Sequence, residues 1–249
     1  MNADATLITI CWNAAATIQR TLDSILKQNA LPAQYLVVDG GSTDGTLEIL
    51  EAAKEKFLAA QVDFRVLPQQ RVQGEAGIPN AWNQAIRLAT GDFVAILNAD
   101  DWYENGVIDT VEQNFRKTDA DAVVLPVTFR DDDGKVVREL QASSFDALPW
   151  KMVLPHPGCF FRRRVYEQLG LYDTRYRISA DYDFVWRCFK AGIRWNFLQD
   201  KMINMQAGGL ADTGRKCARR ETMHIAKKYC RWYDFRPEAA FLLRTITGR

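Results

Sequence analysis

The sequence predicts an α/β fold in which a mixed, mainly parallel sheet is flanked by helices. Short apolar, β-branched runs alternate with amphipathic stretches through the first half of the 249-residue chain, which is the pattern of repeated strand–helix–strand units. Polar segments directly follow two of these runs, where the ligand site of a parallel sheet lies. Apolar residues make up 47% of the chain, enough to bury a substantial core.

Apolar periodicity places the elements of the first half. The expected strands are residues 6–11, 35–39, 64–67 and 93–97, and the expected helices are residues 13–28, 46–60, 80–89 and 104–117. We expect Asn13 to cap the first helix, because its short side chain can accept a hydrogen bond from a free backbone N–H.

The pattern changes in the second half. Further strands are expected at 122–129, 135–140, 158–162, 193–198 and 202–206, and further helices at 180–191, 211–233 and 237–246. Asp133-Gly134 indicates a hairpin between the first two of these strands. Since no repeat or low-complexity linker divides the chain, we expect one domain over 1–210, in two parts (1–101 and 102–210), followed by a helical appendage over 211–249.

Composition excludes several classes of protein. A formal net charge of +1 implies no bulk attraction to nucleic acid. No apolar run approaches the roughly 18 residues of a membrane span, and the N-terminus lacks the features of a signal peptide. The five cysteines are scattered, with no CxxC pair, which is typical of reduced thiols. We therefore expect a cytoplasmic protein.

The last 35 residues are basic, with ten Lys/Arg and three acids between Arg215 and Arg249. Aromatic residues lie among these charges, so the segment could lie on an anionic membrane surface. A solvated helical face and a dimer interface are the alternatives.

Two polar clusters follow expected strands. In VVDGGSTDGT (37–46), Asp39 ends a strand and Gly40-Gly41 lets the backbone pass close to a ligand; the alternative is a tight turn with a helix cap. In ILNADDW (96–102), Asp100 and Asp101 repel each other unless solvent or a cation relieves them. Such oxygen ligands suit Mg²⁺ or Mn²⁺ on a diphosphate, or alternatively the acidic start of a helix.

The order of the motifs resembles a known family. VVDGGSTDGT, GIPNAWNQAI (77–86), GDFVAILNADD (91–101), HPGCFFRR (156–163), SADYDFVWR (179–187) and AGGL (207–210) occur in sequence. Together they resemble the family 2 glycosyltransferases of the GT-A fold. The resemblance covers about residues 6–210 and implies a nucleotide-binding half over 1–101 and an acceptor half over 102–210.

The resemblance implies roles on the donor side. Cys11, Asn13 and Asp39 would line the nucleobase pocket, with Asp39 accepting from a uracil or guanine N–H. Arg71 and Glu75 would extend that pocket.

It also implies roles around the reacting sugar. Asn83 would face the ribose or the donor sugar. Asp100 would hold a divalent metal, Mn²⁺ or Mg²⁺, on the diphosphate, with Asp101 close by. Asp181 would be the general base. His156 would contact the donor phosphate or the acceptor; the alternative is a histidine held in a loop between two prolines.

The segment after the last expected strand completes the implied site. Gly208 and Gly209 would lie in a loop that closes over donor or acceptor.

Two positions depart from the family pattern. Asn98 stands where the family usually has Asp, which leaves a hydrogen bond to ribose but one negative charge fewer. Ala180 stands where Glu is frequent before the base. Asp181 and Asp183 are not one helical turn apart, so they should point in different directions, and either could be the base.

The resemblance implies an inverting glycosyltransferase of class EC 2.4. It would move a sugar from a UDP- or GDP-sugar to a saccharide or lipid-linked saccharide acceptor, in bacterial capsule, exopolysaccharide or O-antigen assembly. The basic tail would then place it peripherally on the inner face of the plasma membrane. The alternatives are a non-catalytic carbohydrate- or nucleotide-binding scaffold and a sugar-nucleotide pyrophosphorylase, whose basic glycine-rich first loop is replaced here by WNAAATIQR.

Overall fold

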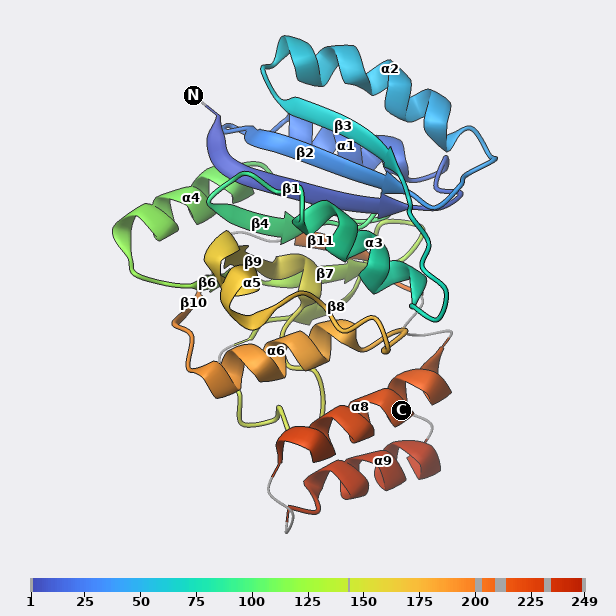
Figure 1. The fold of residues 1–249 in the computed structure, drawn as a ribbon, viewed down its shortest axis with the longest axis vertical. Helices are drawn as coiled ribbons and strands as arrows, with labels where there is room; N and C mark the ends of the chain where they lie inside the picture. The colour runs from blue at the N-terminus through green and yellow to red at the C-terminus, as the bar shows by residue number, and fades with distance from the viewer. Residues whose placement is uncertain (1, 143, 200–202, 209–213, 231–233, 248–249) are drawn as a thin grey trace.

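The computed structural model describes residues 2–142, 144–199, 203–208, 214–230 and 234–247 (Figure 1). The strands are β1 (Ala3–Cys11), β2 (Pro32–Asp39), β3 (Asp63–Pro68), β4 (Phe93–Ile96), β5 (Trp102–Tyr103), β6 (Ala122–Val124), β7 (Val127–Arg130), β8 (Val136–Leu140), β9 (Cys159–Arg162), β10 (Trp195–Phe197) and β11 (Ile203–Gln206). The helices are α1 (Ile18–Leu26), α2 (Thr46–Ala59), α3 (Gly77–Ile86), α4 (Val107–Lys117), α5 (Arg163–Leu169), α6 (Ala180–Ala191), α8 (Arg215–Tyr229) and α9 (Arg236–Thr247), with a 3-10 turn η1 (His156–Gly158).

The strands form two sheets. The larger has the order β10-β6-β9-β4-β1-β2-β3, and the smaller has the order β5-β11-β7-β8. In the larger sheet β3, β2, β1 and β4 are parallel, whereas β9 runs antiparallel to both of its neighbours, β4 and β6. The prediction of a mixed, mainly parallel sheet is confirmed.

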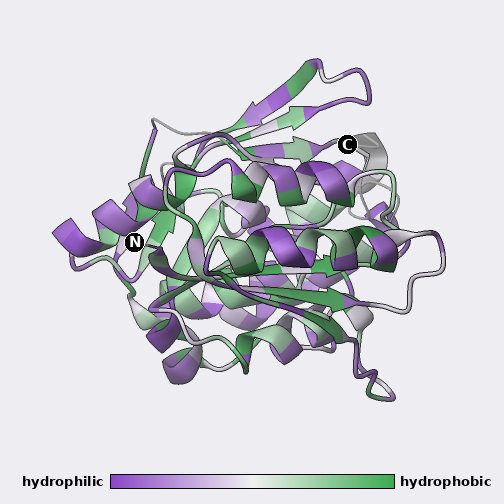
Figure 2. Cartoon of the chain, turned by 90° about the horizontal axis from the view of Figure 1, so that it is seen from above, coloured by the Kyte–Doolittle hydropathy of each residue, from purple (hydrophilic) through white to green (hydrophobic). Residues whose placement is uncertain are grey.

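Helices cover both faces of the large sheet. Alternate side chains of a strand point to opposite faces, so the apolar residues of the strands require cover on both sides. Ile8 of β1 belongs to the core shared with α3 and α6. Its neighbour Leu7 belongs to the core shared with α1, α2 and α4. Figure 2 shows apolar strands running through the centre, with hydrophilic helix surfaces toward the outside.

The structure differs from the sequence-based expectation in several elements: α5 and β5 were not expected, and two further differences have a local cause. The single strand expected over 122–129 divides into β6 and β7, which belong to different sheets. Pro126 stands at the break, where its missing N–H interrupts a strand ladder. Asn13 does not cap α1: the helix begins at Ile18 with Thr17 as its N-cap, and Asn13 has a positive φ of 50°.

The expected tail helices are present as α8 and α9. Ile225 and Ala226 of α8 are buried in the same core cluster as α6, so α8 packs on the domain. Residues 211–213 and 231–233, which the expected first tail helix included, lie outside the described residues. Among the helices that the structure describes, none has both the length and the apolarity to span a membrane.

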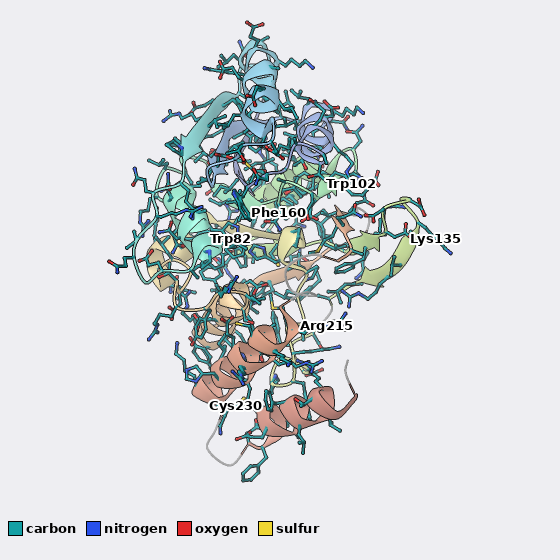
Figure 3. The ribbon with its side chains drawn as sticks, turned by 90° about the vertical axis from the view of Figure 1, so that its right-hand side faces the viewer. Trp82, Trp102, Lys135, Phe160, Arg215 and Cys230 are labelled. Carbon is teal, nitrogen blue, oxygen red and sulfur yellow. The ribbon has the colours of Figure 1, made fainter. Side chains whose placement is uncertain are left out.

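The carboxyl ends of the central strands reach one edge of the sheet. Cys11 at the end of β1 is the register partner of Asp39 at the end of β2, and Ile8 pairs with Ile96 at the end of β4. These strands point to the right in Figure 1, and Figure 3 looks at that side of the molecule. The two polar clusters of the sequence therefore meet at this edge.

Candidate functional site

Asp39 organises the loop that follows β2. Its Oδ2 accepts hydrogen bonds from the backbone N–H groups of Gly41 (2.8 Å) and Ser42 (3.0 Å), and its Oδ1 accepts from the Ser42 hydroxyl (2.5 Å). Burial alone would raise the pKa of Asp39, but these bonds outweigh it and hold the pKa below its ordinary value. Asp39 is therefore a carboxylate at neutral pH.

Cys11 and Asn13 lie beside this loop. The Cys11 thiol donates to Oδ1 of Asp39 at 3.5 Å, and burial together with the Asp39 charge raises the pKa of Cys11 to about 12. Asn13 Oδ1 accepts from the N–H of Thr43 (2.9 Å), while the N–H of Asn13 donates to Ser42 Oγ (2.8 Å). The structure brings the three expected nucleobase residues together.

Arg71 and Glu75 belong to an exposed loop at the same edge. Arg71 Nη2 donates to the carbonyl oxygen of Gly40 (2.7 Å), which joins this loop to the Asp39 loop. Glu75 accepts from the amide of Asn80 (2.7 Å). The two side chains extend the edge that Cys11 and Asp39 begin.

The segment after β4, residues 98–101, carries the carboxylate pair; we call it the carboxylate loop. Asp100 is partly exposed, whereas Asp101 is fully buried. Burial raises the pKa of both, well above the ordinary range for Asp101, where the adjacent Asp100 charge adds to the effect. Asp101 accepts from the N–H of Gln206 (3.2 Å) and, more distantly, from Asn98 Nδ2 (3.4 Å). Asp101 is thus committed to the fold, and Asp100 is the more accessible carboxylate.

Arg20 of α1 holds the carboxylate loop from outside. Its Nη2 donates to the carbonyl oxygen of Asp100 (2.9 Å) and to Gln206 Oε1 (3.0 Å). Its guanidinium lies 3.6 Å from the ring centre of Trp102, a cation–π contact. Trp102 marks the position of this loop in Figure 3.

The donor set fits a divalent cation that is shared with a substrate. Among the described residues, no group of three or more His, Cys, Asp or Glu side chains could hold a metal. A Mg²⁺- or Mn²⁺-type ion is commonly held by one or two carboxylates, with phosphate oxygens and water as its other ligands. Asp100 fits that pattern as the protein ligand.

The expected sugar contact of Asn83 is corrected by the structure. The side chain is 3% exposed, its Nδ2 donates to the carbonyl oxygen of Tyr172 (2.8 Å), and its Oδ1 accepts from the N–H of Tyr172 (2.9 Å). Both ends of the amide hold the segment between α5 and α6 against α3, because a buried amide requires such partners.

His156 is held in an aromatic cluster. Its ring stacks on Trp82 with centroids 4.6 Å apart, and its Nε2 lies 3.1 Å from the Tyr172 hydroxyl. Removal from water lowers the pKa of His156 to about 4, so the ring is neutral at pH 7. Gly158 ends the turn where a Cβ would overlap the carbonyl oxygen of Leu125, which gives a packing reason for this part of HPGCFF.

Asp181 and Asp183 have different surroundings. Asp183 is 1% exposed and accepts from Arg187 Nε (2.9 Å), Lys228 Nζ (3.1 Å) and the Tyr229 hydroxyl (2.9 Å). Asp181 is partly buried and accepts from the N–H of Tyr182 (2.8 Å), with no ion pair to any described residue.

The environment of Asp181 also changes its acidity. Burial raises its pKa to about 6, and a smaller contribution comes from the charge of Glu221 on α8. Such a carboxyl is largely ionised at pH 7 but basic enough to accept a proton. Of the two acids, Asp181 has the properties of a general base.

Comparison with family models relates this chain to known proteins. The model described as Glycosyl transferase family 2 matches residues 6–170, more than half of the chain. This chain belongs to glycosyltransferase family 2. The matched region includes Asp39, Asp100 and His156, and it ends before Asp181 and Gly208.

A relative supports the family. The PGL/p-HBAD biosynthesis glycosyltransferase of Mycobacterium bovis (strain BCG / Pasteur 1173P2) is 33% identical over 179 residues, covering 71% of this chain and 66% of that protein. The family 2 chain thus spans about two thirds of the length of this curated relative.

Solved structures support the fold. S. aureus TarS 1–349 in complex with UDP-GlcNAc has a TM-score of 0.71 and 18% identity, over 99% of this chain and 73% of that one. The mannosyltransferase PcManGT from Pyrobaculum calidifontis, in complex with GDP-Man and Mn²⁺, has a TM-score of 0.67 and 18% identity, over 100% of this chain and 77% of that one. The predicted GT-A fold of this family 2 chain is confirmed.

The end of β11 completes the edge of the family 2 domain. Gly208 is exposed with a positive φ of 89°, two residues after Gln206, whose N–H binds Asp101. Its position places it next to the carboxylate loop. Gly209, the other expected loop residue, lies outside the described residues.

Four residues that contact this site were not expected from the sequence: Arg20 of α1, described above, and three others. Gln206, Tyr172 and Glu221 reach Asp101, His156 and the start of α6 from elements distant in the chain. The only local signal was the position of Gln206 at the end of an expected strand.

Proposed function

We propose that the protein transfers a sugar from a nucleotide-diphosphate sugar to an acceptor hydroxyl, with inversion at the anomeric carbon. The observation that carries the proposal is that Asp100 and Asp181 differ in their surroundings, so that each suits a different step of the transfer. Asp100 is an accessible carboxylate at the strand edge, and Asp181 is a carboxyl with a pKa of about 6 and no ion pair to any described residue. Asp100 suits the leaving diphosphate, and Asp181 suits removal of the acceptor proton.

The donor side uses the edge formed by β1, β2 and β4. A uracil or guanine N–H takes the place of the long thiol contact on Oδ1 of Asp39, beside Cys11 and Asn13, and Arg71 and Glu75 close the pocket. The donors named for the two solved neighbours, UDP-GlcNAc and GDP-Man, support a UDP- or GDP-sugar here.

Asp100 would hold the divalent ion that accompanies the diphosphate. The Mn²⁺ of the Pyrobaculum enzyme supports Mn²⁺ or Mg²⁺ in this role. When bound, such an ion stabilises the negative charge of a leaving diphosphate as a Lewis acid. Asn98, a neutral residue next to the pair, contacts the ribose and leaves the protein with one negative charge fewer near the ion.

The transfer is a single displacement. Asp181 takes the proton of the acceptor hydroxyl, and that oxygen forms a bond to the anomeric carbon. The bond between this carbon and the diphosphate oxygen breaks, and the nucleoside diphosphate leaves with the electron pair. Since the acceptor oxygen attacks opposite the leaving group, the anomeric configuration inverts. His156, neutral at pH 7, contacts the donor phosphate or the acceptor, and Gly208 lies beside the bound substrates.

Nucleotide binding tests the donor site directly. We expect either UDP or GDP to raise the melting temperature in the presence of Mn²⁺ and to lose this effect in EDTA. At 100 times the dissociation constant the stabilisation is about 2.7 kcal/mol, or about 5–10 °C for a chain of this size. No response to either nucleotide with Mn²⁺ would contradict the proposal.

The alternative is a non-catalytic nucleotide- or carbohydrate-binding scaffold on the same fold. Asn98 and Ala180, which depart from the family pattern, favour it. A scaffold would bind the nucleotide but release no nucleoside diphosphate from a nucleotide sugar. We favour catalysis because Asp100 and Asp181 are both present in suitable surroundings.

The acceptor is proposed as a saccharide or lipid-linked saccharide in bacterial cell-surface polysaccharide assembly. The mycobacterial relative is named for a biosynthetic pathway, which supports a role in biosynthesis. We further propose a cytoplasmic location, peripheral on the inner face of the plasma membrane.

The tail supplies the surface for that location. Phe235, which directly precedes α9, and Leu242 of α9 are 70% and 59% exposed, and the cationic Arg236 follows Phe235 in the chain. Exposed apolar side chains on a basic segment are typical of attachment to anionic lipid.

Vesicle sedimentation tests the membrane contact. The double substitution Phe235→Ser/Leu242→Ser is expected to reduce binding to phosphatidylglycerol vesicles at least about tenfold, since apolar burial is lost. Leu58→Ser, which alters a 52% exposed leucine of α2, is the control. Equal binding by all three proteins would assign the tail to packing alone.

A further inference from the structure

Helix α8 contacts the segment that carries Asp181 at a point before it. The Glu221 carboxylate accepts three successive backbone N–H groups, from Arg177 (2.7 Å), Ile178 (2.9 Å) and Ser179 (2.8 Å). These residues lead directly into α6, whose first turn holds Asp181. One side chain of the tail therefore fixes the backbone just before the proposed base.

A second contact lies just after Asp181. Asp183 is almost fully buried, and α8 supplies two of its partners, Lys228 Nζ (3.1 Å) and the Tyr229 hydroxyl (2.9 Å). A buried carboxylate keeps its charge only when such partners are in place. In the sequence, Asp181 thus lies between two segments that α8 contacts, residues 177–179 and Asp183.

The start of α6 depends on this help. Ser179, the residue before the helix, makes no capping bond through its own side chain. Its hydroxyl instead lies 3.4 Å from the Ala218 carbonyl oxygen and from Thr222 Oγ1, both on α8. Charge-assisted hydrogen bonds to backbone N–H groups are among the stronger hydrogen bonds, and Glu221 accepts three of them at the start of α6.

We propose that α8 is a positioning element for the general base, with Glu221 as the positioning residue that orients Asp181 through the backbone of 177–179. The proposal rests on the proposed function, in which Asp181 accepts the acceptor proton. It gives the basic tail a role in the reaction, although α8 lies beyond the region matched by the family model.

Steady-state kinetics with a UDP- or GDP-sugar test the proposal in the 249-residue protein. We expect Glu221→Ala to lower kcat about 10–100-fold, because displacement of a reacting group by about 1 Å costs up to this much. The donor KM and the nucleotide-induced rise in melting temperature should stay within about twofold, since the donor edge is formed by other elements. Glu221→Gln, which keeps one acceptor oxygen, should recover part of the loss. Glu238→Ala, which removes an acid that pairs with Lys227 at 2.7 Å on the tail surface, is the matched control.

Amide hydrogen exchange provides a measurement that does not depend on activity. Exchange over 177–183 should accelerate in Glu221→Ala and remain slow in Glu238→Ala. Unchanged exchange in this segment, or a wild-type kcat in Glu221→Ala, would overturn the positioning role while leaving the proposed function intact. A wild-type protein that binds the nucleotide but releases none from a nucleotide sugar would instead reject the proposed function.

Discussion

Asp181→Asn is expected to leave donor binding intact and to lower sugar transfer by about 10²–10⁴-fold, the usual contribution of a general base. The amide keeps the size and the hydrogen bond of the carboxyl group but cannot take the acceptor proton. Isothermal titration with UDP or GDP and Mn²⁺, together with the rate of nucleoside diphosphate release in the presence of acceptor, measures both effects.

The pH profile of wild-type protein provides the internal control for this variant. Because burial raises the pKa of Asp181 to about 6, the protonated and inactive form accumulates as the pH falls through 6, and kcat should fall with it. The charge of Glu221 favours the protonated form of Asp181, whereas Tyr172 and Cys159, whose own pKa values are raised by burial and by the Asp181 charge, are neutral in this pH range. The residual activity of Asp181→Asn should not show this fall of kcat at low pH.

Asp183→Asn distinguishes the structural role of Asp183 from the catalytic role proposed for Asp181. Removing the charge of Asp183 leaves Arg187 and Lys228 without their buried partner, which should lower the free energy of unfolding by about 3 kcal/mol. A loss of donor affinity in Asp181→Asn as large as that in Asp100→Asn would contradict the assignment of Asp181 as the base.

Asp100→Asn should weaken metal-dependent nucleotide binding by about 100-fold or more, since substitutions of even the outer partners of a metal site cost about 10–100-fold. The protein ligand is lost while Asp101 remains buried and committed to Gln206. Thermal-shift titration with UDP or GDP, with Mn²⁺ and with EDTA, measures the effect.

The control for Asp100→Asn is Asp133→Asn, which removes an exposed acid from the turn between β7 and β8. It should retain the response of the wild-type protein. An unchanged Mn²⁺-dependent shift in Asp100→Asn would remove Asp100 from the metal site.

Most strands and helices followed from the local pattern of apolar residues. β1, β2 and β4 are apolar on both faces because helices cover both sides of the sheet, so their sequences identify them. The division between β6 and β7 was missed, although Pro126 is visible in the sequence. Whether a proline breaks a strand or lies at its edge depends on the neighbouring strands.

The site residues, too, were predictable only where their position depends on local sequence. The positions of Asp39 and Asp100 were predictable, because parallel strands bring their carboxyl ends to one edge. The role of Asn83 was not, since its partner is the backbone of Tyr172, 89 residues away. The choice between Asp181 and Asp183 likewise required the position of α8.

The sequence alone determined the alternation of elements, the mainly parallel sheet and the edge at which its polar residues gather, because these depend on local patterns and on the handed geometry of strands and helices. The tertiary structure alone decided which polar groups are occupied by the fold and which are accessible. Packing of distant segments sets burial and partners: Asp101 and Asp183 are enclosed, Asp100 and Asp181 remain accessible, and Glu221 of the tail reaches the start of α6.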